Sequence, residues 1–359
     1  MGDGSESLTG ESPTIREVAD LADLSVATVS RAFNKPLLVK PETYEKVMGA
    51  VEELGYEPRK RYAPTSIGLV APQDFAEGRV FGNYVGGVIQ GADKYCARNG
   101  LVLSLVSVDS PMMHHMVTTY RMAGLLYLNI SVEDPLRDRL LSEPRLRTVL
   151  VGYPPKNVRQ ASDSSLSWVT IDDARAAEEA VQYLVDLGHR RIGVIQGDER
   201  HVSNERRLEA VRSALSEPGV EIPGPHVESE GFVGQNGFRA FMERGDFETE
   251  SGFQAMVRLL DHDHPPTAVF AFNDLMAFGA LQAITENGLE VPRDVSLIGC
   301  DDIVARFLRP ELTTVHQPAI ELGEMAARVL DDLAAGARVV RSQLEARLIL
   351  RESCAQPSS

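Results

Sequence analysis

The chain alternates between short apolar runs and longer amphipathic stretches, and this alternation limits its possible folds more than any other feature. Helical patterns at 86–99, 174–187 and 274–287 separate several of the runs. Strands that alternate with helices form βαβ units with parallel sheets and right-handed crossovers. Because about 290 residues exceed what one sheet holds, we expect an α/β fold with two lobes. The strand-like runs lie at 67–71, 101–106, 124–130, 148–152, 168–171, 191–196, 268–272 and 295–299.

Polar side chains follow several of the predicted strands. Asp74, Asp172, Asp173, Asn273 and Asp301 each come at or just after the end of an apolar run. In open α/β sheets, ligands bind outside the carboxyl ends of the strands. We therefore expect a ligand site where these side chains meet. The same residues also suit the capping of the helices that follow, which is the structural alternative to ligand contact.

Residues 12–58 have a different pattern, with three short helices in place of strands. Apolar residues at three-to-four spacing over 15–22 indicate a first helix, and Ser25 suits the cap of a second. A third helical pattern covers 41–54. The tight turn at Asp23 uses a residue that visits left-handed conformations more readily than most. This spacing predicts a helix-turn-helix headpiece.

The second helix of the headpiece indicates which side chains would face DNA. Arg31 would bond to guanine or hold a phosphate, while Val26 and Ala27 would offer apolar contact to thymine methyl groups. A small helical cap without DNA contact is the alternative that the spacing alone leaves open. The predicted DNA-binding residues are Thr14, Ser25, Val26, Ala27, Thr28, Arg31 and Asn34, with Arg59 and Arg61 of the basic linker as phosphate contacts.

Composition and charge exclude other classes of protein. Hydrophobic residues make up 43% of the 359 residues, yet no apolar run approaches the roughly 18–20 residues that span a bilayer. No secretory signal is visible, and three widely spaced cysteines form neither a disulfide framework nor a zinc site. A net charge of −16 argues against coating of nucleic acid by bulk charge, although residues 12–63 are neutral. We expect a cytoplasmic, nucleoid-associated protein with no membrane contact, cofactor or metal.

Five motifs, in order along the chain, resemble the lac repressor family (LacI/GalR-type transcriptional regulators) from about 14 to 353. They are ATVSRAFN at 27–34, LGYEP at 54–58, DLGHRRIGVIQG at 186–197, PTAVFAFNDLMAFGALQAITENGLEVPRDVSLIGCDD at 266–302 and PELTTVHQP at 310–318. The resemblance implies a helix-turn-helix headpiece on a two-lobed core like that of periplasmic sugar-binding proteins. It also implies a homodimer that binds operator DNA.

The resemblance implies how the chain is divided. A tail that we expect to be disordered precedes the headpiece, and a short linker joins the headpiece to a core whose two lobes each draw on separated segments. The expected divisions are the tail at 1–11, the headpiece at 12–58, the linker at 59–66, the N-lobe at 67–185 and 317–340, the C-lobe at 186–316 and 341–351, and a second tail at 352–359.

In this family a small molecule, usually a sugar, nucleoside or purine, binds between the lobes. Carboxylate and amide groups bond to hydroxyls, arginine donates in a fork, and aromatic faces cover C–H groups, so a sugar or related polyol suits the matching residues. These residues are Phe81, Asp173, Arg207, Phe247, Asn273 and Asp301, with Asp172 beside Asp173, Arg206 as the register alternative to Arg207, and Phe232 as the alternative to Phe247.

We predict a transcriptional repressor whose operator affinity this small molecule controls. The alternative is a small-molecule sensor or binding protein with a degenerate headpiece that no longer binds operator DNA. The short linker at 59–66 motivates this alternative, because Pro64 leaves little room for the hinge helix of the family. No phosphate loop or nucleophile elbow is visible, so we do not expect an enzyme.

Two stretches that contain histidine, and the end of the chain, bear on metal binding and on the oligomeric state. Adjacent His114 and His115 would diverge on a helix, and 261–264 suits an exposed loop, so neither is expected to bind a metal. After Arg351 the remaining chain is too short for the heptads of a tetramer-forming coiled coil. We therefore expect a dimer that forms through the core.

Overall fold

The computed structural model describes residues 13–34, 39–56, 66–70, 82–106, 122–128, 131, 137, 147–154, 166–216, 232–233 and 238–358. Some of the predictions concern residues that are not among those described. They concern the tail at 1–11, the linker before Ser66 with Arg59 and Arg61, and the side chains of Asp74, Phe81, His114 and His115.

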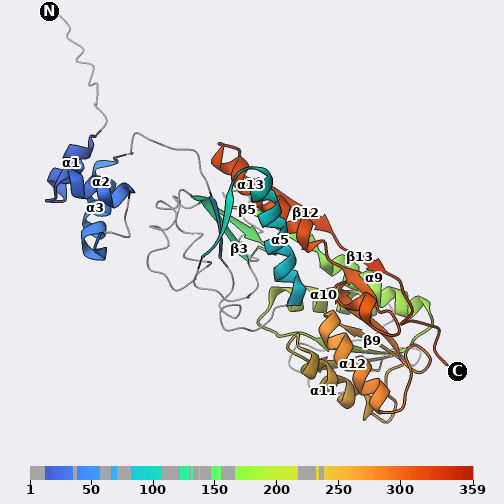
Figure 1. The fold of residues 1–359 in the computed structure, drawn as a ribbon. Helices are drawn as coiled ribbons and strands as arrows, with labels where there is room; N and C mark the ends of the chain where they lie inside the picture. Colours follow the sequence, from blue (N-terminus) through green and yellow to red (C-terminus); the bar gives the residue numbers. More distant parts are fainter. Residues whose placement is uncertain are drawn as a thin grey trace, which may run out of the picture.

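Three helices near the start of the chain form a headpiece with its own core (Figure 1). They are α1 (Ile15–Leu21), α2 (Val26–Asn34) and α3 (Pro41–Leu54). The buried side chains that hold them together are Val18, Ala19, Ala22, Val29, Ala32, Val47 and Ala50. The helix-turn-helix prediction is confirmed.

Local capping explains where the headpiece helices begin and turn. Thr14 and Glu17 form a capping box in which each side chain accepts the other's backbone N–H. Asp23, in the turn that follows, has a φ of 54°, in the left-handed region. The hydroxyl of Ser25 accepts the N–H of Thr28 at 3.1 Å and so begins α2. Gly55, with a φ of 62°, ends α3.

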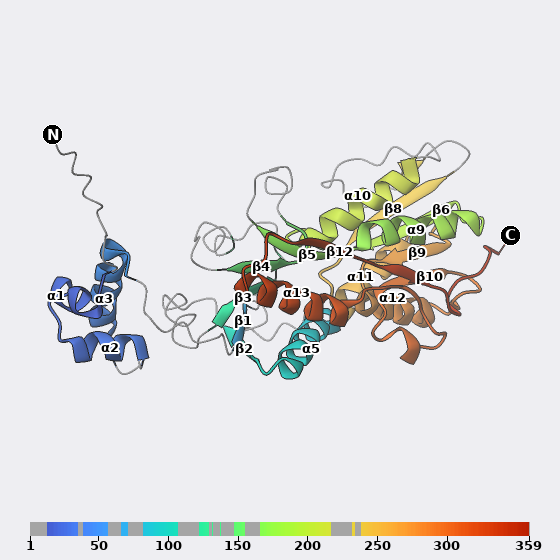
Figure 2. The same ribbon diagram turned by 90° about the horizontal axis from the view of Figure 1, so that it is seen from above.

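The first lobe of the core is a parallel sheet covered on one face by two helices (Figures 1 and 2). The strand order is β12-β5-β4-β3-β1-β2, with β1 (Ser66–Val70), β2 (Val102–Val106), β3 (Met122–Leu128), β4 (Thr148–Val151), β5 (Ser167–Asp172) and β12 (Arg341–Glu345). The helices are α5 (Gly82–Arg98) and α13 (Ala319–Ala334). Their backbones touch, because a Cβ on Gly91 would lie 1.9 Å from the carbonyl oxygen of Ile320.

The second lobe is a larger sheet with parallel strands in its centre and antiparallel strands, β13 and β7, at its edges. The order is β13-β11-β10-β9-β6-β8-β7, with β6 (Arg191–Gln196), β7 (Phe232–Val233), β8 (Arg239–Arg244), β9 (Ala268–Ala271), β10 (Ser296–Asp301), β11 (Thr313–His316) and β13 (Arg347–Ile349). Its helices are α9 (Asp173–Asp186), α10 (Val202–Ser216), α11 (Thr249–Leu260), α12 (Asp274–Glu286) and the short 3₁₀ helix η3 (Ala305–Phe307).

The chain passes between the sheets after β5, after β11 and after β12, and two segments lie in a different lobe from the one expected. The expected N-lobe includes α9, but Ala177 and Leu184 of this helix are buried in the core of the second lobe. The expected C-lobe includes 341–345, but β12 pairs in parallel with β5 in the first sheet. An apolar periodicity shows that a segment is buried without showing against which of two apolar sheets it packs.

The last described residues are not a free tail, contrary to expectation. Ser353 accepts the N–H of Thr313 at 2.8 Å, and its own hydroxyl donates to the carbonyl of Leu297. The carbonyl of Ala355 lies 2.9 Å from Nε2 of the buried His189. These bonds attach the end of the chain to the second sheet. Among the residues that the structure describes, no helix is long and apolar enough to cross a membrane.

Candidate functional site

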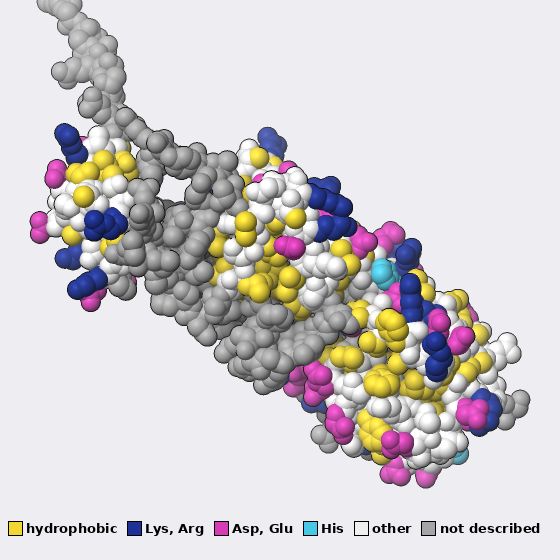
Figure 3. Space-filling view, in the orientation of Figure 1, with side chains coloured by type: hydrophobic (Ala, Val, Ile, Leu, Met, Phe, Trp, Pro, Cys, Tyr) yellow, Lys and Arg dark blue, Asp and Glu magenta, His cyan; other side chains and the backbone are white. Residues whose placement is uncertain are grey.

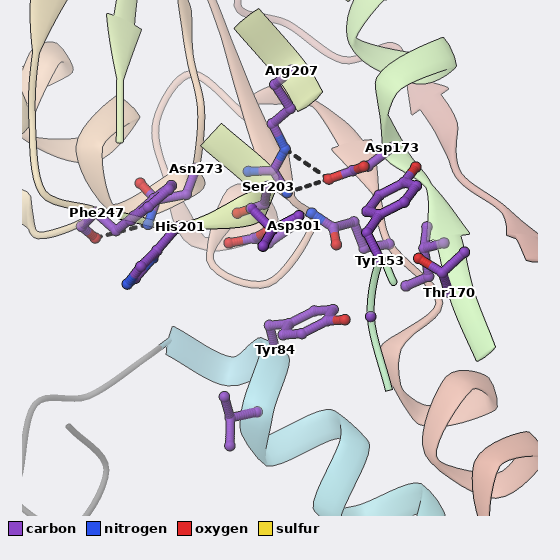
Figure 4. Close-up of a pocket in the computed structure, with 15 residues that line it drawn as sticks. Tyr84, Tyr153, Thr170, Asp173, His201, Ser203, Arg207, Phe247, Asn273 and Asp301 are labelled. Atoms are coloured by element: carbon purple, nitrogen blue, oxygen red, sulfur yellow. Dashed lines mark hydrogen bonds and ion pairs between the residues drawn. The ribbon is translucent and has the colours of Figure 1, made fainter. Parts of the chain in front are cut away.

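A cavity lies between the two lobes, beside the carboxyl ends of their parallel strands (Figure 4). Tyr84 of α5 and Thr170 of β5 line it from the first lobe. The second lobe contributes most of the remaining side chains. Of the residues expected to bind a ligand, the structure brings together Asp173, Arg207, Phe247, Asn273 and Asp301 in this cavity, whereas Phe81 lies outside the described residues.

Asp173 and Arg207 form a buried ion pair in the wall of the cavity (Figure 4). Asp172 caps α9 by accepting the N–H of Arg175, so Asp173, one residue later, is turned toward α10. Nε and Nη2 of Arg207 each lie 2.9 Å from Oδ2 of Asp173, and Nη1 donates to the carbonyl of Phe272. Each of the two side chains is 5% exposed.

Each of these two residues has a neighbour that the sequence left as an alternative. Asp172 is occupied by its cap, while the guanidinium of Arg206 lies over the ring of Tyr153, 4.5 Å from its centroid. Nη1 of Arg206 also lies 3.8 Å from Oε2 of Glu209, on the next turn of the helix. Asp173 and Arg207 are therefore the members of the two pairs that meet inside the cavity.

One carboxylate oxygen of Asp173 accepts no hydrogen bond from the described residues. Oδ2 receives both contacts from Arg207, but the buried Oδ1 has no hydrogen-bond partner among the described residues. A buried carboxylate oxygen without a partner costs free energy, on the order of 1–3 kcal/mol or more for a charged group. An oxygen of this kind in a cavity wall is suited to accept a hydrogen bond from a ligand.

Asn273 and Phe247 are held by each other on the second lobe. Asn273 is the N-cap of α12, and its Oδ1 accepts the N–H of Met276 at 2.8 Å. Its Nδ2 donates to the carbonyl of Phe247 at 2.7 Å. Phe247 has a φ of 71°, a costly conformation for a non-glycine residue that these contacts maintain. Asn273 therefore has the structural role of a cap and also lines the cavity.

The adjacent aspartates at the end of β10 have different surroundings. Asp301 lines the cavity, and its Oδ1 accepts the side-chain N–H of Gln317 at 3.0 Å. Burial raises the pKa of Asp301 well above its ordinary value; Asp274 and Asp173 add to this effect, and Arg207 opposes it. Asp302 instead forms an ion pair with Arg351, and its Oδ2 lies 3.1 Å from Nδ1 of His316.

The headpiece presents the expected residues of α2 to solvent. Val26, Ala27 and Arg31 are exposed, whereas Val29 and Ala32 face the headpiece core. The hydroxyls of Thr14 and Ser25 are used in helix capping, and that of Thr28 lies 2.8 Å from Ser25 Oγ. Asn34 ends α2, and its side chain is outside the described part.

Comparisons with known proteins place this arrangement in a family. Family models described as "Bacterial regulatory proteins, lacI family" and "Periplasmic binding protein-like domain" match residues 14–59 and 181–354. The HTH-type transcriptional repressor PurR of Shigella dysenteriae is 34% identical over 357 residues, covering 95% of this chain and 97% of that protein. The chain belongs to the LacI family. It is a DNA-binding transcriptional repressor of this family with an effector-binding domain.

Solved structures of LacI-family regulators are similar to this one over nearly their whole length. The regulator CelR in complex with cellobiose is 32% identical, with a TM-score of 0.67, and the match covers 95% of this chain and 99% of that one. The lac repressor dimer bound to operator and the anti-inducer ONPF has a TM-score of 0.66 at 24% identity, covering 96% and 100%. These relatives are transcriptional regulators.

Several residues that line the cavity of this LacI-family core were not predicted from the sequence. They are Tyr84, Tyr153, Thr170, His201, Ser203 and Gln317. His201 and Ser203 follow the end of β6, so the rule about carboxyl ends of strands could have found them. Gln317 lies inside a recognised motif, PELTTVHQP. Tyr84 lies in the first turn of a helix and carries no comparable signal. Phe247 lines the cavity, and the side chain of its alternative, Phe232, is not described.

Proposed function

We propose that an uncharged small molecule rich in hydroxyl groups, a sugar or related polyol, binds in the cavity between the lobes and controls the operator affinity of this repressor. The single observation that carries the proposal is the buried Oδ1 of Asp173, which has no partner among the described residues and belongs to a residue of the cavity wall. A sugar hydroxyl donates to such an oxygen.

The charges of the cavity favour a neutral effector over an anion. Arg207 is the permanently charged cation among the described lining residues, and each of its three nitrogens already donates to Asp173 or to the carbonyl of Phe272. Asp301 adds a second carboxyl group. A phosphate or carboxylate in the cavity would therefore meet a guanidinium that is already paired with Asp173.

Aromatic rings complete the lining and suit the apolar face of a sugar. Tyr84, Tyr153 and Phe247 all contribute to the cavity, and such rings cover C–H groups. The relative CelR, 32% identical, has a solved structure whose title names cellobiose. A nucleoside would also stack on these rings. The sugar is favoured because the hydroxyl groups of Thr170 and Ser203 also line the cavity and can bond to sugar hydroxyls.

Calorimetric titration of the purified repressor tests the class of effector. The probes are cellobiose, glucose, glucose 6-phosphate and adenosine. We expect binding of a neutral sugar and none of the sugar phosphate. A phosphate that binds more tightly than its parent sugar would contradict the charge argument, and binding of adenosine alone would indicate a nucleoside effector. Because linkage is reciprocal, the bound effector and the operator must change each other's affinity by the same factor.

The headpiece supports sequence-specific operator binding in the cytoplasm through α2. On the face shown in Figure 3, Lys and Arg side chains of the headpiece lie beside Asp and Glu, so bulk charge alone does not explain DNA affinity. We expect Arg31→Ala to cost about 1–3 kcal/mol of specific binding in a competition against random DNA. Lys46→Ala on α3 is the matched control for loss of one exposed positive charge. An equal loss on all DNA sequences would make Arg31 a phosphate contact only.

A homodimer accounts for apolar side chains that the described surface leaves exposed. Phe307 of η3 is 81% exposed, and Val102 and Leu105 on the edge strand β2 are 61% and 56% exposed. A second copy of the chain is the partner that we propose, since two headpieces would read two half-sites. Phe307→Glu should give a monomer in sedimentation equilibrium. A dimer that persists at low micromolar concentration would place the interface elsewhere.

A further inference from the structure

The two lobes touch beside the cavity, at His201. This residue lies before α10, and its carbonyl accepts the N–H of Asn204 at 3.1 Å. Its backbone also forms an isolated antiparallel β-bridge with Ser131, a first-lobe residue that follows β3. Arg137 donates through Nη1 to the carbonyl of Ser131 at 3.1 Å. The bridge thus connects the start of a second-lobe helix to the first lobe.

The ring of His201 is part of the cavity wall (Figure 4). It is stacked on the ring of Phe247, with centroids 5.1 Å apart and planes 12° apart, and His201 is 8% exposed. The Phe247 ring also lies against Gly197, where a Cβ would come within 1.9 Å of it. Asn273 holds the Phe247 carbonyl. The stacked pair is therefore held by the second lobe at Phe247 and by the first lobe at His201.

We propose that the bridge between Ser131 and His201 is a latch that closes the lobes over the effector and positions the His201 ring against it. This inference rests on the proposed function, because it takes the cavity as the effector site. Ser131 is not among the described residues that line the cavity, so it acts on the effector through His201 as a positioning residue. A contact that favours the closed arrangement raises the apparent affinity of any ligand that binds that arrangement better.

A matched pair of variants separates the backbone of residue 131 from its side chain. Ser131→Pro removes the N–H and restricts φ, which breaks the bridge, whereas Ser131→Ala keeps the backbone intact. Both are compared in the full-length repressor. A melting temperature and a circular-dichroism spectrum close to those of the unmodified protein show that each variant is folded.

The first measurement needs no effector. Spin labels on Ala97→Cys of α5 and Gln282→Cys of α12, both exposed, report the separation of the lobes, with Cys354→Ala removing the partly exposed native thiol. Ser131→Pro should broaden the distance distribution toward larger values, and Ser131→Ala should leave it unchanged. Identical distributions in the two variants would overturn the latch.

The second measurement uses cellobiose as the probe. Ser131→Pro should weaken its binding by about tenfold, and Ser131→Ala by less than about twofold. In a His201→Ala background the proline should cost less than about twofold, because the ring that the bridge positions is gone. His201→Phe, which keeps a ring, should restore the sensitivity. If Ser131→Pro weakens cellobiose binding by the same tenfold factor with His201 and with His201→Ala, the bridge does not act through His201.

The two measurements distinguish failure of the latch from failure of the proposed function. If the unmodified repressor binds no neutral sugar, the proposed effector class is wrong, and the label distances still decide whether the bridge closes the lobes. If sugars bind and the distances do not respond to Ser131→Pro, the latch is wrong and the effector class stands.

Discussion

The two lobes of the core share one architecture but contribute different chemistry to the cavity between them. The first lobe supplies neutral side chains that carry hydroxyl groups, among them Tyr84 and Thr170. The second lobe supplies Arg207, Asn273 and Asp301, and Asp173 joins them at the crossover into α9. Because we propose this cavity as the effector site, we expect the second lobe to provide most of the effector affinity.

The polar groups of the second lobe are held in place before a ligand arrives. Asn273 is fixed by its cap and by Phe247, and Arg207 is fixed by Asp173 and the Phe272 carbonyl. Such groups lose little conformational entropy on binding. The pKa of Tyr84, in contrast, is raised mainly by burial, with no hydrogen bond among the causes. Substitutions in each lobe test this division of roles.

The largest effect is expected from Arg207→Ala. This change leaves the carboxylate of Asp173 buried without its counter-ion, and breaking a buried pair in this way costs about 3–5 kcal/mol. Urea unfolding measures the loss. The neighbouring Arg206→Ala is the control, because the carboxylate nearest to Arg206, that of Glu209, is 3.8 Å away and half-exposed, and this change should cost less than about 1 kcal/mol. Equal losses would contradict a special role for the Asp173–Arg207 pair.

The pH dependence of stability should reveal Asp274 of the second lobe. Burial raises the pKa of Asp274 from 3.8 to about 6, against hydrogen bonds from Thr314 and Ile303 that lower it. The folded state then holds the proton more tightly than the unfolded state, so this group's contribution to the free energy of unfolding is greatest at low pH. That contribution falls by roughly 3 kcal/mol as the pH rises from about 4 to above 6.

The change Asp274→Asn removes this titration. Urea unfolding at pH 4, 5, 6 and 7 should show a smaller decrease in unfolding free energy for Asp274→Asn than for the unmodified repressor. The asparagine can still accept the N–H of Ile303 and donate to Thr314, so the fold is retained. The same slope in both proteins would show that Asp274 does not bind the proton.

Asp301 and Asp302 offer a direct comparison of effector binding with stability. Asp301→Asn should weaken effector binding by about 10–100-fold with little change in melting temperature, because Asp301 lines the cavity. Asp302→Asn should do the reverse, because Asp302 pairs with Arg351 and His316 instead. Both residues have positive φ, which asparagine tolerates. Loss of melting temperature in Asp301→Asn alone would make Asp301 a structural residue.

The smallest effect is expected from the first lobe. Tyr84→Phe removes one hydroxyl from the cavity wall and keeps the ring, so effector binding should weaken by about two- to tenfold. Calorimetry on this variant beside Asp301→Asn compares the two lobes directly. A loss as large as that of Asp301→Asn would show that both lobes contribute equally to the affinity.

Much of the fold and part of the site followed from local patterns. The cap at Ser25 and the turn at Asp23 depend on neighbours in the chain, and the structure has them where the sequence predicts. Asp173 and Asn273 were found because strand ends collect polar residues beside ligand sites. His201 and Tyr84 were not found, since their role depends on contacts between lobes.

The sequence by itself determined the class of the molecule: a helix-turn-helix headpiece, two parallel α/β lobes and polar residues at the strand ends. These features come from periodicity, capping and turn chemistry, which act over a few residues. Only the tertiary structure decided which member of each adjacent pair lines the cavity, Asp173 beside Asp172 and Arg207 beside Arg206. It also decided that β12 joins the first sheet and that the last residues bind the second. These arrangements depend on packing between segments that are far apart in the chain, and the local sequence does not determine that packing.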